Sequence, residues 1–151
     1  MGPLSVTMTY TSLEQIEGLV GRFEAGSLSP GEWNHTTHLT IGLWYLLHHP
    51  EYEAAARTID GIRAHNRLHG VQQGSDRGYH ETVTLFWLAV TRRFLDREGR
   101  GDCTLDLVNA FVSARAHQSP AIFEFYTRAR LRSWKARYYW LEPDLRSLDS
   151  I

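Results

Sequence analysis

Three histidines in two short motifs carry the strongest chemical signal in this sequence of 151 residues. His35 and His38 belong to the segment WNHTTHL at residues 33–39, and His80 belongs to GYHET at residues 78–82. A spacing of three on a helix places Cβ atoms about 5–6 Å apart, so two imidazoles can share one metal ion. A third imidazole from a neighbouring helix start would leave one position open for water. The sequence therefore predicts a mononuclear centre with a divalent metal ion, zinc or iron, held by His35, His38 and His80.

The residues around His80 supply further groups that a reaction needs. We expect Glu81 to move a proton or to orient an imidazole, although an acid in the first turn of a helix is also favoured by the helix dipole. Tyr79 is expected to line the pocket. Arg137 comes from an arginine-rich segment at 128–137 and is expected to bind an anionic group of the substrate, the alternative being a solvated charged face. The predicted catalytic residues are thus His80, Glu81, Tyr79 and Arg137.

The favoured interpretation is a small metal-dependent enzyme acting on a small organic substrate, and the sequence does not separate hydrolase, lyase and oxygenase. A first alternative uses the same pocket without metal. A histidine near the positive end of a helix dipole stays neutral, so His35 or His80 can act as acid or base in an isomerase, dehydratase or cyclase. A second alternative is a helical module that binds a ligand or dimerises without catalysis, because a lone buried histidine is more often a hydrogen-bonded core group.

The histidine pair lies just inside the start of a predicted helix at residues 30–47. Ser29 is a candidate N-cap, Pro30 suits the first helical position, and Glu32 completes a capping box. After His38 the segment is almost wholly apolar for the length of a helix, so the helix runs from a polar mouth into the core.

The sequence also predicts how this helix is oriented. His35 falls on one line with the core positions Leu39, Gly42 and Leu46, so we expect its ring to point inward. Gly42 allows another element to approach closely. The helices at 30–47 and 78–96 are expected to bring their N-terminal turns to the same end of the fold, as parallel diagonal members of an up-down bundle or by crossing steeply.

Most of the remaining sequence shows apolar residues at spacings of three and four, the pattern of amphipathic helices. We predict helices at 13–25, 51–68, 78–96, 104–116 and, shorter, 119–126, followed by a tail that packs over the bundle. Alternating β-type runs are missing from the sequence. The predicted architecture is one all-α domain at 12–151, a bundle of four to six helices, preceded by a loose N-terminal arm at 1–11.

Composition limits the classes of partner. The 16 basic and 17 acidic residues give a net charge of −1, which offers no electrostatic case for nucleic acid or an anionic membrane. The sequence shows neither a signal peptide nor an apolar run of about 20 residues. The single cysteine, Cys103, excludes an internal disulfide and fits a reducing compartment. We expect a cytoplasmic protein with a small-molecule substrate, and a homodimer is left open.

These motifs resemble those of a widespread, uncharacterised family of small, all-helical bacterial proteins. The resemblance rests on W-x-H-x-x-H-L at 33–39, on G-Y-H-E-T at 78–82, and on the ending that contains Ala136-Arg137 and the segment WLEPDL at 140–145. It covers about residues 18–148. It implies that Trp33, His35, His38, Tyr79, His80, Glu81 and Arg137 belong to one site, and it implies no particular activity.

Overall fold

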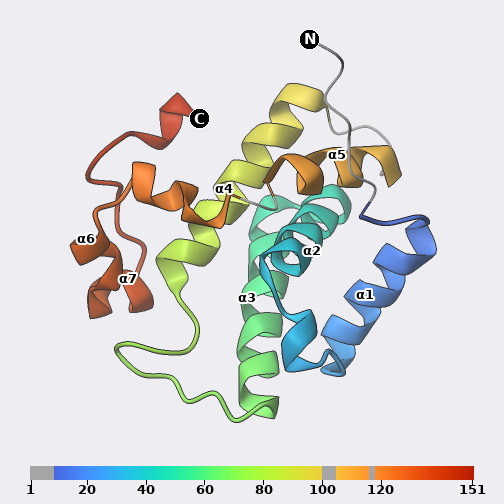
Figure 1. The fold of residues 1–151 in the computed structure, drawn as a ribbon, viewed down its shortest axis with the longest axis horizontal. Helices are drawn as coiled ribbons and strands as arrows, with labels where there is room; N and C mark the ends of the chain where they lie inside the picture. Colours follow the sequence, from blue (N-terminus) through green and yellow to red (C-terminus); the bar gives the residue numbers. More distant parts are fainter. Residues whose placement is uncertain (1–8, 100–104, 116–117) are drawn as a thin grey trace.

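The computed structural model describes residues 9–99, 105–115 and 118–151, and within these ranges all regular secondary structure is α-helical or 3-10 helical (Figure 1). The long helices are α1 (Leu13–Ala25), α2 (His35–His48), α3 (Glu51–Leu68), α4 (Glu81–Glu98) and α5 (Leu105–Arg115). Shorter elements are α6 (Arg128–Arg132), α7 (Trp134–Tyr138) and 3-10 turns at Pro30–Glu32, Ser119–Glu124 and Leu148–Ser150. The predicted all-α, single-domain class is confirmed.

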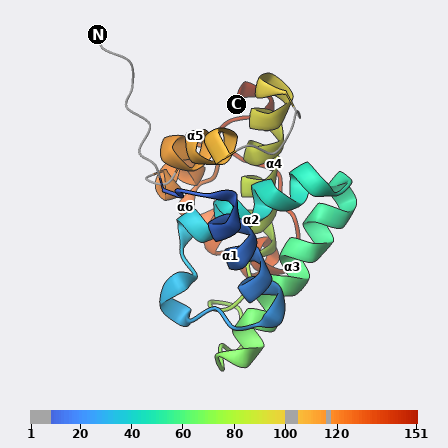
Figure 2. The same cartoon turned by 90° about the vertical axis from the view of Figure 1, so that its right-hand side faces the viewer.

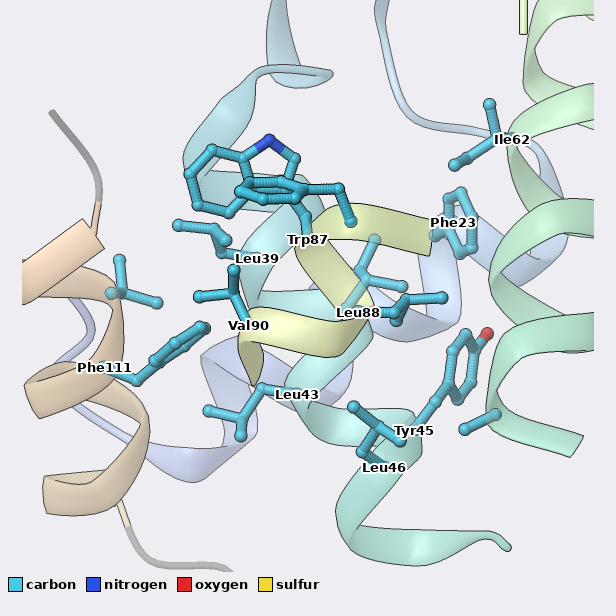
Figure 3. Packing of buried hydrophobic residues seen from close by; sticks show 14 of the residues in the cluster. Phe23, Leu39, Leu43, Tyr45, Leu46, Ile62, Trp87, Leu88, Val90 and Phe111 are labelled. Atoms are coloured by element: carbon cyan, nitrogen blue, oxygen red, sulfur yellow. The ribbon is translucent and has the colours of Figure 1, made fainter. Parts of the chain in front are cut away.

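Helix α2 lies at the centre of the molecule. It packs against α1, α3, α4 and α5 (Figures 1 and 2). Leu39, Ile41 and Leu43 are fully buried, as expected for a helix that is covered on several sides. Figure 3 shows Leu43 of α2 beside Val90 of α4 in the middle of the hydrophobic core.

Helices α2 and α4 cross steeply instead of lying parallel. The start of α2 contacts α4 through His35 and Trp87, and a Cβ added to Gly42 would lie 3.1 Å from Leu88 Cδ2. Leu46, one turn further along α2, lines a cavity together with Leu88. The length of α2 therefore passes over about the same turns of α4, and Gly42 provides the close approach that its lack of a side chain predicts.

The start of α2 differs from the sequence-based prediction. Ser29 does cap a helical turn, accepting from the N–H of Glu32, but this turn is the short 3-10 segment. Trp33 then adopts an extended conformation, and Asn34 begins α2 by accepting a hydrogen bond from the N–H of Thr37 at 3.0 Å. The capping box is thus satisfied locally, and a second cap starts the long helix. His35 becomes the first residue of α2.

The sequence signals for α1 and α3 are confirmed. Ser12 caps α1, and Gly26 ends it with a φ of 71°. Phe23 of α1 is buried against Gly61 of α3. A Cβ added to Gly61 would lie 2.2 Å from the Phe23 ring. The same ring stacks on Trp33 with centroids 5.4 Å apart, so the α1–α3 contact also fixes the segment before α2.

The chain after α5 closes over the beginning of α4. Helix α7 packs against α4 and α6. The Thr82 hydroxyl donates to the carbonyl of Tyr139 at 2.8 Å and accepts from the N–H of Leu141 at 3.2 Å. Tyr126 is fully buried and donates to the carbonyl of Leu141 at 2.7 Å, which ties this segment to the chain beyond α7.

The N-terminal arm is anchored at its described end. Tyr10 exchanges two backbone hydrogen bonds with the side chain of Asn109, each 2.9 Å long, and its hydroxyl pairs with Thr40 Oγ1 at 2.7 Å. Residues 1–8 and Cys103 lie outside the described residues.

We predict opposite effects for two helix-interior glycines. Gly61→Ala forces a methyl group into the buried Phe23 ring and should lower the free energy of unfolding by about 1–3 kcal/mol. Gly21→Ala, on α1 with open space around it, should raise that free energy by up to about 1 kcal/mol through helix propensity. Urea unfolding measures both. A stabilising Gly61→Ala would contradict the packing described here.

Candidate functional site

Two adjoining cavities lie between the start of α2, α3, and the segment that leads into α4. The first, which we call the histidine cavity, has a volume of about 250 Å³ and is lined by Trp33, His38, Ile62, Asn66, Val71, Gly78, Tyr79, His80, Val83 and Thr84. The second, the arginine cavity, has a volume of about 280 Å³ and is lined by Arg63, Asn66, Arg67, Val71, Gln73, Tyr79, Arg137 and Tyr138. The cavities adjoin because Asn66, Val71 and Tyr79 line both.

His38 presents an unusual ring nitrogen to this site. Its side chain is partly exposed, but Nε2 is shielded from solvent and has no hydrogen-bond partner among the described residues. Burial lowers the pKa of His38 to about 4, and the nearby His35 contributes to the lowering. The imidazole is therefore neutral at pH 7. A shielded nitrogen without a partner is costly, and such groups are concentrated where a ligand or a reaction uses them.

Aromatic rings hold His38 in place. Its ring lies 5.7 Å from that of Trp33. Trp33 in turn contacts His65, with ring centres 5.6 Å apart, and stacks on the Phe23 ring. His65 is buried, and burial lowers its pKa. His65 therefore belongs to the packing that supports Trp33.

His80 has a structural position at the start of α4. It is the N-cap, and its Nδ1 accepts a hydrogen bond from the N–H of Val83 at 3.2 Å. Its Nε2 then carries the proton and donates to the carbonyl of Leu131 at 2.8 Å. Burial lowers the pKa of His80, and the positive charge of Arg137 adds to this effect. Both ring nitrogens are thus engaged, although the ring lines the histidine cavity.

The arrangement of these rings does not fit a centre with three imidazole ligands. His80 has no ring nitrogen available while it caps α4 and bonds Leu131. His35 turns its Nε2 to the carbonyl of Arg115, 3.2 Å away. Within the described residues, no three His, Cys, Asp or Glu side chains form a group able to hold a metal ion. The metal centre stays a prediction that would require His80 to leave its present partners.

The sequence predicts the same role, that of a metal ligand, for His35 and His38, and the structure places the two rings in different surroundings. The His35 ring packs edge-on against Trp87 at 4.6 Å and lines neither cavity. Trp87 and the Arg115 carbonyl thus hold the His35 ring in place. Burial lowers the pKa of His35. The helix begins at His35 rather than at Pro30, and its crossing with α4 turns His38 toward His80. His38 therefore joins the cavity and His35 supports the helix crossing.

The segment before α4 is held by two side chains. Gln73 clamps Tyr79, accepting from its N–H at 2.8 Å and donating to its carbonyl at 3.0 Å. Gly78 has a φ of 88°, and a Cβ there would lie 2.5 Å from Gln73 Oε1, so this position requires glycine. Arg137 reaches across from α7 and donates from Nη1 to the carbonyl of Gly78 at 2.9 Å. The GYHET motif is thereby fixed against the tail.

The arginine cavity is positively charged. Arg63, Arg67 and Arg137 contribute guanidinium groups, and no acidic side chain is among the described residues that line either cavity. The Nε of Arg137 is shielded and has no partner among the described residues, as for His38 Nε2. The guanidinium of Arg63 lies 4.8 Å from the centre of the Tyr79 ring. Such a set of forked donors is suited to a carboxylate or phosphate group.

Tyr79 and Glu81 form a pair at the edge of the site. The Tyr79 hydroxyl donates to Glu81 Oε1 at 3.0 Å. Burial, and then the negative charge of Glu81, raise the pKa of Tyr79, so the phenol remains protonated. Tyr79 lines both cavities, whereas Glu81 lines neither. Glu81 therefore lies in a position to orient Tyr79.

The structure thus gathers His38, Tyr79, His80 and Arg137 around two adjoining cavities, with Glu81 behind Tyr79 and His35 outside. Sequence reasoning missed Arg63, Asn66 and Arg67, which α3 contributes to the lining. Their spacing of three and four places them on one face of α3 and was the signal available. It also missed Gln73, which no spacing rule indicates.

Comparison of the chain with protein-family models, with curated proteins and with solved structures gives no match. None of the helices in the described ranges combines the length and the apolar character that crossing a membrane requires.

We predict that His80 contributes to stability as a cap. His80→Ala removes the acceptor of the Val83 N–H and the donor to Leu131, so the free energy of unfolding should fall by about 1–2 kcal/mol. His80→Asn keeps a good N-cap and should lose less. Urea unfolding with and without a chelator tests this. If the chelator alone brought the wild type down to the level of His80→Ala, a metal role would replace the cap.

We also predict a pH effect from His38. Its pKa falls from 6.5 to about 4 on folding, so between these values the unfolded chain binds more protons than the folded chain. The free energy of unfolding is therefore expected to decrease as the pH falls through this window, by at most about 3 kcal/mol from His38. Urea unfolding of wild type and His38→Asn at pH 7.5, 6, 5 and 4 measures the difference. Equal pH dependence in the two proteins would contradict a buried, neutral His38.

Proposed function

We propose that this protein is a metal-free acid–base enzyme acting on a small organic anion, in a reaction of the isomerase, dehydratase or cyclase type. The observation that carries the proposal is the shielded, unpartnered Nε2 of His38 in a cavity that adjoins three guanidinium groups. A neutral imidazole that is kept out of water and left unpaired is ready to exchange a proton with a bound molecule.

The arginine cavity supplies the binding energy. Arg137 already has Nη1 on the Gly78 carbonyl, which aims its guanidinium, and its Nε is unpaired among the described residues. Together with Arg63 and Arg67 it would bind a carboxylate or phosphate through charge-assisted hydrogen bonds. A substrate anchored there extends past Tyr79 into the histidine cavity, because Tyr79 and Asn66 line both spaces.

His38 gains basicity when the substrate is bound. With a pKa of about 4 it is a weak base in the free protein. An anionic substrate stabilises the imidazolium ion and raises that pKa toward the working pH. His38 would then remove a proton from a C–H or O–H group and return it at another position, so the reaction needs no external reactant. The Tyr79–Glu81 pair keeps the wall of the cavity in place during this transfer.

A proton-exchange experiment tests the proposal. A panel of 2-oxo acids and keto phosphates, each with a C–H next to a carbonyl, is incubated with the protein in D₂O and followed by proton NMR. At least one member should exchange faster than without protein. His38→Asn should reduce the acceleration about 100-fold or more. Arg137→Gln should mainly raise the KM, by about tenfold, because it weakens anion binding.

The control is His48→Asn, which alters an exposed histidine at the far end of α2 and should leave exchange unchanged. Treatment with a chelator should also have no effect. The proposal fails if His38→Asn retains full activity, if exchange depends on an added divalent metal, or if none of the anions in the panel binds.

A further inference from the structure

A third cavity lies further along α4 than the histidine cavity. Its volume is about 580 Å³, within the range of small-molecule pockets, and none of its lining residues belongs to the histidine or arginine cavity. Its walls come from α4, from the end of α5, from residues 118–125 and from the C-terminal segment. We call it the α4–α5 cavity.

Aromatic rings line this cavity. Phe86 and Trp87 of α4 and Phe125 all contribute, and all three side chains are buried. Phe86 lies 5.3 Å from Phe125 and 5.1 Å from Trp87, measured between ring centres. These rings form the apolar floor of the cavity, to which Trp87 and Phe125 contribute the small parts that remain exposed. The ring of an aromatic ligand can pack edge-on or offset against these parts.

Positive charge surrounds the aromatic surface. Arg97, Arg115 and Arg146 line the cavity, and Glu124 is the single acidic residue among the described residues that line it, which leaves two positive charges in excess there. Among the described residues, none of the three arginines takes part in an ion pair with a carboxylate.

Two of these arginines are positioned by neighbours. Arg115 Nη1 donates to Gln118 Oε1 at 2.8 Å. The guanidinium of Arg146 lies 5.3 Å from the centre of the Phe125 ring. Burial lowers the pKa of Arg115, and the positive charge of Arg97 lowers it further. The positive charges of Arg97 and Arg115 therefore repel each other, and a bound anion would reduce this repulsion.

We propose that the α4–α5 cavity binds an organic phosphate that carries a flat aromatic body. A phosphate dianion matches the excess of two positive charges, and guanidinium groups bind its oxygens in a forked geometry. The aromatic body packs against the exposed parts of Trp87 and Phe125. This site is independent of the proposed acid–base site, because the two share no residue.

Binding is tested with phenyl phosphate as the probe. The readout is the indole N–H signal of Trp87 in a ¹H–¹⁵N spectrum, and the Trp87→Phe variant assigns this signal. Phenyl phosphate should shift this signal in a saturable way. Inorganic phosphate, which lacks the ring, and benzoate, which carries one negative charge, should each bind at least about tenfold more weakly. Arg115→Gln should weaken phenyl phosphate binding about tenfold or more, and Arg97→Gln is a second variant at a more exposed position.

Two matched controls locate the binding. Arg128→Gln removes a guanidinium that lies over Phe123, outside the cavity, and should leave the Trp87 shift unchanged. Arg137→Gln impairs the arginine cavity and should also leave it unchanged. The proposal is overturned if phenyl phosphate does not shift Trp87, if Arg115→Gln and Arg97→Gln bind as the wild type does, if inorganic phosphate binds as tightly, or if Arg137→Gln abolishes the shift.

Discussion

The close crossing of α2 and α4 at Gly42 determines where the functional side chains lie. Because no side chain separates Gly42 from Leu88, the two helices approach closely there and cross steeply. The crossing carries the start of α2 toward the start of α4. It directs His38 into a cavity with His80 and packs His35 against Trp87. A larger residue at Gly42 would press against the Leu88 side chain, whose Cδ2 lies 3.1 Å from the position of an added Cβ.

Opposing electrostatic environments lie side by side in this site. Burial keeps His38 neutral, whereas the adjoining cavity concentrates guanidinium groups without an acidic neighbour in its lining. Each of these conditions is unfavourable in the free protein, and an anionic ligand relieves both. It pairs with the arginines and stabilises a proton on the imidazole. In the proposed reaction this reciprocal relief would link binding to proton transfer. Of the four shielded side-chain atoms without a partner among the described residues, two, His38 Nε2 and Arg137 Nε, belong to residues that line these neighbouring cavities.

Local patterns in the sequence predict most of the fold. The spacing of apolar residues gives α1 and α3 with their correct ends, because caps such as Ser12 and Gly26 act within one turn. The start of α2 was placed too early. Both Ser29 and Asn34 are good caps, and the choice depends on the extended conformation of Trp33 stacked on Phe23, a contact between distant segments.

The sequence indicates some of the residues that line the candidate site, but not the part that each of them plays. The histidine motifs indicate the right region, but the identity of the free imidazole depends on how α2 crosses α4. The cap formed by His80 was also hidden, because a ring nitrogen seldom replaces the oxygen of a Ser, Thr, Asp or Asn cap. Arg137 reaches the GYHET motif from 59 residues away, and no local pattern specifies the carbonyl that it binds.

The proposed function requires that the His38 ring is neutral at pH 7. A pH titration of the histidine ring nitrogens by long-range ¹H–¹⁵N NMR measures its protonation state directly. We predict that His38 titrates at a pH of about 4, is neutral at pH 7, and keeps its signals when Zn²⁺ is added. A titration near 6.5, or the simultaneous shift of His35, His38 and His80 on addition of Zn²⁺, would contradict the account.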